Sequence, residues 1–408
     1  MHSSCVKYLC RKYSFMASVR QLFLARQAQT TNFPLALEVE RAEGMYLYTP
    51  EGKKILDLIA GISVCNVGHR HPKVMAAIQE QMDKYMHLMV YGEYIQSPQV
   101  KLAEALHRVL HPSLDNVYFV NSGSEAIEGA MKLAKRYTGK ANFVACHGSY
   151  HGSSHGALSI MGSEDFRQNY RPLLPGITHI DFNDIEAVTS AIDEHTAAVV
   201  LEVVQSESGY VPANHDFLRA ARKRCNETGA LLILDEVQTG FGRSGSLFAF
   251  HEVKDFFPDI VVMAKGMGGG LPIGAFVAPQ HIMAALKDNP ILGHITTFGG
   301  NPVSCAASLA VLDELLNSKL VCEVPKKEAR FREGLQHPKI LSVTGKGLML
   351  SMQLENFDKV QSVMRACLDK GVVTDWFLFN QNALRIAPPL IISMEEIDFV
   401  CQVVREVL

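Results

Sequence analysis

Apolar and polar residues alternate along most of the chain in the pattern of a mostly parallel α/β sheet. From about residue 56 onward, short apolar runs are separated by helix-like stretches, which is typical of strands joined by crossover helices. Four of these runs end at polar clusters: residues 117–120 before 121–124, 197–204 before 205–207, 231–234 before 235–236, and 260–263 before 264–266. Ligands of open parallel sheets lie outside the carboxyl ends of the strands, so the four clusters predict one shared site.

The chain follows a different pattern after about residue 301. A helical stretch at 304–316 precedes a charged segment at 326–333. Shorter β-like pieces follow at 348–354 and 383–386, before a helix-like end at 394–408. This order predicts a smaller C-terminal α+β lobe beside the larger sheet.

Composition narrows the possible functions. The 408 residues suffice for a large and a small lobe. With 48% hydrophobic and 20% charged residues, the chain is expected to be a soluble globular protein. Its formal charge of −3 gives no reason to expect nucleic acid as a partner. No apolar run approaches the roughly 18 residues of a membrane span, so no membrane partner is expected.

The cysteines favour a reducing compartment. There are nine of them, an odd number with no C-x-x-C pair, which indicates neither a disulfide framework nor a zinc ribbon. We therefore expect a cytoplasmic protein.

The N-terminus suggests an alternative compartment. The first 37 residues contain no acid, and their basic residues are Lys7, Arg11, Lys12, Arg20 and Arg26. This is the composition of a mitochondrial presequence. A short disordered extension, or a true start at Met16, would account for the same composition.

The cluster at residues 121–125 is a candidate phosphate site. Small residues here, including Gly123 and Ser124, lead into a helix-forming stretch at 126–137. Such a turn presents free backbone N–H groups and the positive end of a helix dipole, which favour a phosphate. A plain serine N-cap with Glu125 beyond it is the alternative interpretation.

Asp235 follows an apolar strand, as the acidic residue of a P-loop NTPase does. That function requires a G-x-x-x-x-G-K-[ST] loop. Lys140 and Lys346 each follow a glycine, but Ala141 and Gly347 come next where Ser or Thr is needed. An aspartate at a sheet edge can instead pair with the protonated ring nitrogen of a pyridine cofactor.

Lys265 also follows an apolar strand and precedes a glycine-rich segment, residues 266–270. Burial lowers the pKa of a lysine, and a neutral amine is what a Schiff base requires. A surface lysine at the start of a glycine loop is the commoner case. The presence of Asp235 and of the phosphate-type turn favours the catalytic interpretation.

Three histidines, His147, His151 and His155, are spaced four apart. On a helix this spacing would place them on one face as metal ligands, but three glycines in the same stretch oppose a helix. We therefore expect a loop and no metal. In this loop Tyr150 could lay its ring against a flat cofactor.

The chain resembles the class III, fold type I aminotransferases, which use pyridoxal 5′-phosphate and include acetylornithine, ornithine and 4-aminobutyrate aminotransferases. The likeness extends from about residue 33 to the C-terminus. It rests on ordered blocks: NSGSEA from residue 121, YHG from 150, EVVQSESG from 202, LDEVQTGFGRSG from 234, AKGMGGGLPIG from 264, TTFGGNP from 296 and LRIAPPL from 384.

The resemblance implies a role for each residue of a cofactor site. Lys265 would be the Schiff-base lysine and the general base and acid, and Asp235 would pair with the pyridinium nitrogen. The other implied contacts are Gln238 to the 3′-oxygen, Tyr150 stacked on the ring, and Gly123 with Ser124 around the phosphate.

The resemblance also implies substrate contacts and an assembly. Arg385 would clamp a substrate carboxylate through its bidentate fork. Glu207 would pair with this arginine while a donor without an α-carboxylate is bound, then swing away for 2-oxoglutarate. Thr297 would reach the phosphate of the neighbouring subunit, which implies a homodimer with active sites at its interface.

One position departs from the family pattern. Enzymes acting on acetylornithine or ornithine usually carry an arginine for the donor carboxylate where this chain has Ser153. A donor of that kind would lose a charge-assisted contact worth about 1.5–3 kcal/mol. The donor would then lack this carboxylate, place it elsewhere in the site, or have it bound by another basic residue such as Arg70 or Arg167.

The resemblance implies a large domain with a mostly parallel seven-stranded sheet flanked by helices, and a small α+β domain. We expect an extension at 1–32, small-domain segments at 33–60 and 301–408, and a cofactor-binding domain at 61–300. The expected activity is ping-pong transamination from an amino acid or ω-amine to an oxo acid, with 2-oxoglutarate as the expected acceptor. An epimerase, aminomutase or decarboxylase on the same fold is the alternative. A non-catalytic scaffold is disfavoured because Lys265 and Asp235 are present.

Overall fold

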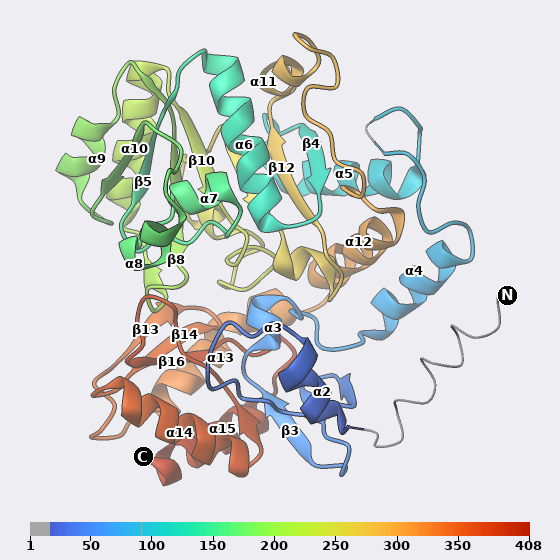
Figure 1. Ribbon diagram of the computed structural model, residues 1–408, viewed down its shortest axis with the longest axis vertical. Helices are drawn as coiled ribbons and strands as arrows, with labels where there is room; N and C mark the ends of the chain where they lie inside the picture. The colour runs from blue at the N-terminus through green and yellow to red at the C-terminus, as the bar shows by residue number, and fades with distance from the viewer. Residues whose placement is uncertain (1–16, 91) are drawn as a thin grey trace, which may run out of the picture.

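The computed structural model describes residues 17–90 and 92–408, and its larger lobe is built on a seven-stranded sheet (Figure 1). The strand order is β4-β12-β11-β10-β7-β5-β6, and only β12 runs antiparallel to its neighbours. The strands are β4 (Asn116–Val120), β5 (Asn142–Cys146), β6 (Ile177–Ile180), β7 (Thr196–Glu202), β10 (Leu231–Asp235), β11 (Ile260–Met263) and β12 (Gly274–Ala278). The predicted mostly parallel sheet is confirmed.

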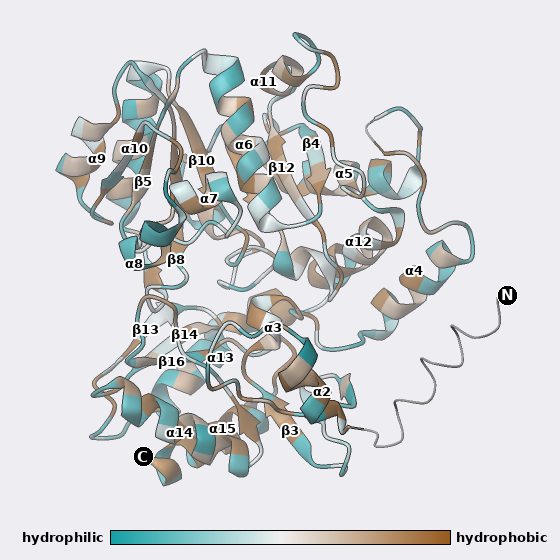
Figure 2. Cartoon of the chain, viewed as in Figure 1, coloured by the Kyte–Doolittle hydropathy of each residue, from teal (hydrophilic) through white to brown (hydrophobic). Residues whose placement is uncertain are grey.

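The strands of this sheet are apolar throughout because helices cover both of its faces. Leu231 and Ile233 pack with α6 (Gly123–Thr138) on one face. Leu232 and Leu234 belong to the core on the other face. That face carries α5 (Ser97–Val109), α10 (His215–Thr228) and α12 (Pro302–Asn317). Figure 2 shows hydrophobic colour on β10 and β12 between these layers.

The smaller lobe combines the two ends of the chain. Its C-terminal sheet has the order β13-β14-β16. The N-terminal strands form a second sheet, in which Leu56 of β3 pairs with Val372 of β15. The strands of the lobe are β1 (Arg41–Glu43), β2 (Tyr46–Tyr48), β3 (Lys54–Asp57), β13 (Ser342–Lys346), β14 (Met349–Gln353), β15 (Val372–Val373) and β16 (Ala383–Ile386). Its larger helices are α13 (Leu320–Gly334), α14 (Phe357–Asp369) and α15 (Met394–Val407).

Shorter elements connect the two lobes and border the sheet edges. The remaining helices are α2 (Val19–Arg26), α3 (Ala60–Ser63), α4 (Pro72–Met82), α7 (His155–Ser159), α8 (Glu164–Arg167), α9 (Ile185–Ala191) and α11 (Gln280–Met283). The remaining strands are β8 (Val204–Gln205) and β9 (Val211–Pro212), which pair with each other.

The expected N-terminal extension is described only from residue 17. Lys7, Arg11 and Lys12 lie outside the described residues, whereas Arg20 and Arg26 lie on α2, which buries none of its side chains. In the part of the chain that the structure describes, no helix has both the length and the apolar character that a membrane crossing requires.

Candidate active site

A cavity of about 780 Å³ lies at the carboxyl ends of the central strands. Each of the four polar clusters predicted to converge contributes to its wall, through residues 121–125, Ser206, Asp235 and residues 264–265. The predicted site residues that line it are Gly123, Ser124, Tyr150, Asp235, Gln238 and Lys265. Glu207, Thr297 and Arg385 do not line it.

One end of the cavity is formed by the N-terminus of α6. Ser122 caps this helix, because its side chain accepts a hydrogen bond from the backbone N–H of Glu125 at 3.2 Å. The serine N-cap and the phosphate-type turn are therefore compatible, since the first N–H groups of a helix have no partner within it. The turn also packs tightly, because a Cβ at Gly152 would lie 2.4 Å from Oγ of Ser124.

Asp235 ends β10 and is held through both of its oxygens. Oδ1 accepts from the backbone N–H of Val237 at 2.9 Å, and Oδ2 lies 2.8 Å from Nδ1 of His151. Burial acts against a charged imidazole, but Asp235 raises the pKa of His151 above its usual value. The raised pKa favours the protonated imidazole beside this carboxylate.

The sequence suggested His151 only as one of three possible metal ligands in a loop and did not predict its contact with Asp235. The three histidines of that loop do not converge. His155 contacts the carbonyl oxygen of Pro172, and His147 lies beside the ring of His179. In residues 17–90 and 92–408, no group of three His, Cys, Asp or Glu side chains is placed to hold a metal.

Glu202 is a second buried carboxyl group behind the cavity. It accepts the backbone N–H of Tyr150 at 3.0 Å and both the backbone N–H and the hydroxyl of Ser206. Burial raises its pKa to about 7. These contacts tie the Tyr150 loop to β7.

Lys265 follows β11 in a left-handed backbone conformation, with φ of 46°. Burial lowers the pKa of its amine, although Glu207 and Asp235 act in the opposite direction. A lowered pKa increases the neutral fraction of the amine, which is the nucleophilic form.

Gln238 and Tyr150 both line the cavity, and of these two it is the amide of Gln238 that is left without a partner in the part of the chain that the structure describes. The amide nitrogen and oxygen of Gln238 are buried and have no partner among the described residues. The hydroxyl of Tyr150 lies 3.1 Å from that of Ser153. A buried amide with no partner is costly, so it marks a place where a bound group would supply the hydrogen bonds.

Arg385 lies on β16 outside this cavity, in a buried cluster of charged residues. Its Nη2 donates to Glu207 at 2.8 Å, and its Nε donates to Asp375 at 2.9 Å. Burial alone would raise the pKa of Glu207, but Arg385 holds it below its usual value. Burial raises the pKa of Asp375 to about 6 despite the same arginine. Asp375 had no signal in the sequence.

Two arginines were considered as alternative partners for the carboxylate of the donor. Neither Arg70 nor Arg167 lines the cavity. Arg167 pairs with Glu164 at 2.8 Å instead. No arginine is found among the described residues of the cavity wall.

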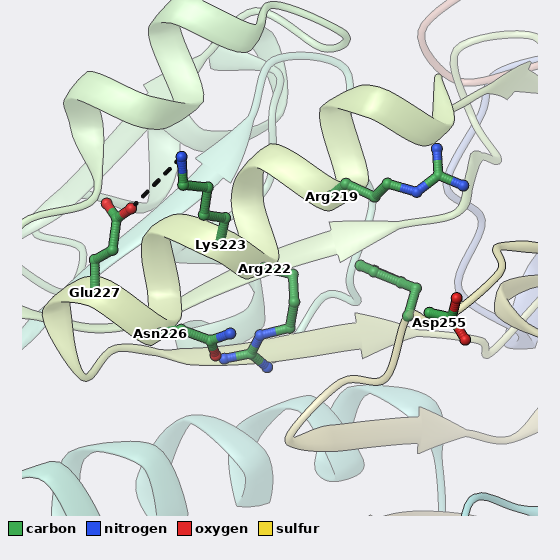
Figure 3. Close-up of a pocket in the computed structure, with 7 residues that line it drawn as sticks. Arg219, Arg222, Lys223, Asn226, Glu227 and Asp255 are labelled. Atoms are coloured by element: carbon green, nitrogen blue, oxygen red, sulfur yellow. Dashed lines mark ion pairs between the residues drawn. The ribbon is translucent and has the colours of Figure 1, made fainter.

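A hollow on the surface of α10 is distinct from this site (Figure 3). Lys223 faces Glu227 across one helical turn at 3.9 Å. Arg222 pairs with Asp259 at 2.7 Å. These charged side chains pair with neighbours on the same surface. We therefore interpret the hollow as an ordinary solvent-exposed helix face and not as a binding site.

Comparisons with known proteins agree with this geometry. The family model for class III aminotransferases matches residues 26–408. The acetylornithine aminotransferase of Caldanaerobacter subterraneus subsp. tengcongensis is 39% identical over 379 residues, which cover 90% of this chain and 93% of the relative. The chain belongs to the class III aminotransferase family.

Solved structures of aminotransferases share the whole fold. The ornithine aminotransferase of Toxoplasma gondii superimposes with a TM-score of 0.88 at 26% identity, covering 98% of this chain and 97% of that one. A PLP-bound amine transaminase from an uncultivated Pseudomonas species gives a TM-score of 0.86 at 26% identity, covering 94% and 97%. This aminotransferase therefore has the fold type I architecture and catalyses transamination with pyridoxal 5′-phosphate. The comparisons do not favour the epimerase, aminomutase or decarboxylase alternative.

The residues of the cavity fit this cofactor. The start of α6 offers backbone N–H groups for a phosphate, and Asp235 offers a buried anion for a protonated ring nitrogen. Gln238 has an unpartnered buried amide for a ring substituent, and Lys265 has an amine with a lowered pKa.

Proposed function

We propose that this aminotransferase passes an amino group to a 2-oxo acid, with 2-oxoglutarate as the acceptor, and that Arg385 binds the carboxylate of the acid. The observation that supports this is the buried pair of Arg385 and Glu207 at 2.8 Å. A carboxylate already occupies part of the guanidinium fork, so a substrate carboxylate can replace it with the same charge and geometry.

Pyridoxal 5′-phosphate supplies a ring that accepts the electrons left when a proton is removed beside the substrate nitrogen. Lys265 would remove that proton through its neutral amine and return it to the cofactor carbon on the other side of that nitrogen. Asp235 would face the ring nitrogen and help to keep that nitrogen protonated. Gln238 would hydrogen-bond the ring oxygen, and Tyr150 would lie against the ring.

The phosphate would be held at the start of α6 by Gly123 and Ser124, with the helix dipole adding to the hydrogen bonds. This contact would anchor the cofactor by its phosphate. Lys265 would serve both half-reactions.

The donor proposed for this cavity lacks a carboxylate at the position next to Tyr150. Ser153 occupies that position, and its hydroxyl is 3.1 Å from that of Tyr150. Since the described cavity wall contains no arginine, a carboxylate there would lack the bidentate partner that an arginine supplies. An ω-amine, or an amino acid whose carboxylate lies elsewhere, fits better.

A panel of amines tests donor and reaction type together. In single turnovers without oxo acid, ω-amines should bleach the visible absorption of the lysine-bound cofactor faster than N-acetylornithine does. Ser153→Arg should reverse this preference, and His155→Arg, at an exposed position nearby that does not line the cavity, controls for an added charge. A wild-type preference for N-acetylornithine would contradict the proposed donor class.

We also propose a homodimer in which Thr297 reaches the phosphate of the partner site. Exposed apolar side chains of residues 291–298, and of residues 86–90 and 92–100, which contact the same region, support an interface, because patches of this kind mark association surfaces. They are Met86, Ile95, Val100, Ile291, Leu292, Ile295 and Phe298.

Co-expression tests this assembly. Chains carrying Lys265→Ala and chains carrying Thr297→Ala should each be impaired alone. A mixed dimer would contain one site with both residues intact, so activity should reappear. Activity that stays at the level of the separate variants would contradict a shared site.

We infer that the enzyme works in the cytoplasm. The seven cysteines that the structure describes are all free, and five of them are buried. This supports a reducing compartment.

A further inference from the structure

The loop between β8 and β9 brings two residues to Arg385. Strands β8 and β9 pair through Gln205 and Val211, so residues 206–210 form a short connection across which both Glu207 and Tyr210 reach the arginine. The connection closes through a left-handed backbone at Tyr210, with φ of 53°. A bulky residue adopts this conformation only where its surroundings hold it there.

The hydroxyl of Tyr210 accepts one hydrogen bond, and its own proton has no acceptor among the described residues. Its oxygen accepts a hydrogen bond from Nη1 of Arg385 at 3.2 Å. Its side chain is fully buried, and its ring stands edge-on to that of Phe377, with centroids 4.8 Å apart. No described residue accepts its proton. Burial raises the pKa of Tyr210, so the hydroxyl keeps that proton at neutral pH.

The other groups around Arg385 determine where a substrate carboxylate can bind. Asp375 occupies Nε, and the backbone oxygen of Trp376 accepts from Nη2 at 3.3 Å. Glu207 accepts a hydrogen bond from Nη2 and lies in the loop between β8 and β9. Loops are in general more mobile than the strands that they connect. A carboxylate that replaces Glu207 therefore takes the Nη1–Nη2 edge of the guanidinium, beside the hydroxyl of Tyr210.

We propose that Tyr210 determines specificity for carboxylate substrates by donating its free hydroxyl proton to the carboxylate bound at Arg385. Three donors, Nη1, Nη2 and the tyrosine hydroxyl, then surround the anion. Asp375 acts as a positioning residue that keeps the Nε edge closed. The inference rests on the carboxylate-binding role proposed for Arg385.

Tyr210→Phe tests the hydroxyl while it preserves the ring that packs on Phe377. We expect the KM for 2-oxoglutarate to rise about tenfold, the effect of losing one hydrogen bond to a charged group. The half-reaction with an amine that has no carboxylate should be unchanged. Tyr170→Phe, at an exposed tyrosine, is the matched control and should match the wild type in both half-reactions.

A merely structural role would give a different result. With an aldehyde acceptor that carries no carboxylate, Tyr210→Phe and the wild type should react equally. Equal losses with the aldehyde and the oxo acid, or an unchanged KM for the oxo acid, would overturn the inference. Arg385→Ala separates the two proposals: if it spares the oxo acid, the carboxylate site itself is misassigned, whatever Tyr210 does.

Discussion

Two buried cation–carboxylate clusters lie near Lys265, and they are built differently. In one, His151 and Asp235 are both positioned by the large lobe, with 0% and 5% of their side chains exposed. In the other, Arg385 comes from the small lobe and shares its guanidinium between Asp375 of the same lobe and Glu207 of the large lobe.

The carboxylate of Asp235 keeps the same partners throughout, whereas Arg385 can exchange one of its carboxylate partners. Asp235 has both oxygens bound by its own lobe, so its anion is held at one place. Arg385 has two acidic partners, so one of them, Glu207, can be given up without leaving a buried cation unpaired. A site that must release one carboxylate for another benefits from this arrangement.

Removing Lys265 should have the largest effect, because both clusters serve its chemistry. Lys265→Ala should abolish turnover and the visible absorption of the lysine-bound cofactor. Absorbance spectra and steady-state assays measure this, with Lys223→Ala on the surface of α10 as the control. Wild-type turnover in Lys265→Ala would remove the basis of the proposed mechanism.

The permanent cluster is tested by Asp235→Asn, which keeps the shape of the side chain and removes its charge. Proton removal should slow by about two orders of magnitude or more, because the anion no longer stabilises the protonated ring nitrogen. Cofactor binding should persist. Stopped-flow absorbance of the amine half-reaction measures the rate, and Asp216→Asn is an exposed control. An unaltered rate would contradict the role of Asp235.

The exchangeable cluster is tested by Arg385→Ala. The KM for the oxo acid should rise about tenfold to a hundredfold, as expected for the loss of charge-assisted hydrogen bonds. The half-reaction with an amine that lacks a carboxylate should change much less. Arg365→Ala, at an exposed arginine of α14, is the control. Equal damage to both half-reactions would argue against the carboxylate clamp.

Another buried carboxyl group, that of Glu236, shows what burial does without a cationic partner. Glu236 is fully buried, accepts hydrogen bonds from Thr239 and from the backbone N–H of Phe250, and its pKa is raised from 4.5 to about 7. The folded protein therefore holds this proton between about pH 4.5 and 7 while the unfolded chain releases it. The contribution of Glu236 to the free energy of unfolding is largest below pH 4.5 and falls by up to about 3 kcal/mol as the pH rises through 7.

Glu236→Gln should remove this pH dependence: its amide oxygen can still accept from the backbone N–H of Phe250, and its amide nitrogen can donate to the hydroxyl of Thr239, which donated to Glu236. Urea unfolding at pH 5 and pH 8 should show a smaller difference between the two pH values for the variant than for the wild type. Glu227→Gln, at a partly exposed glutamate of α10, is the control. An identical pH dependence in Glu236→Gln and the wild type would mean that Glu236 is ionised in the folded state.

Much of the fold and the centre of the site could be predicted from the sequence. Continuous apolar strands such as residues 231–234 and 260–263 indicated a sheet buried on both faces, and Asp235 and Lys265 follow directly at their ends. The residues next to each strand in the sequence were enough to predict these two positions, because the carboxyl ends of parallel strands lie at one edge of a sheet. Helix α14 was missed, although Asn356 caps its start and its buried residues Val360, Val363, Met364 and Cys367 recur at helical spacing. Strand β13 was missed because its five residues, SVTGK, include only one large apolar side chain.

Other features depended on residues far apart in the chain. His151 meets Asp235 across 84 positions, and Arg385 meets Glu207 across 178 and Tyr210 across 175. No local pattern specifies such pairs, because hydrogen-bonding partners are chosen by the packing of whole elements. The sequence by itself determined which chemical groups stand at the strand ends. Only the tertiary structure decided which charges face each other, which are buried, and which proton is left without an acceptor.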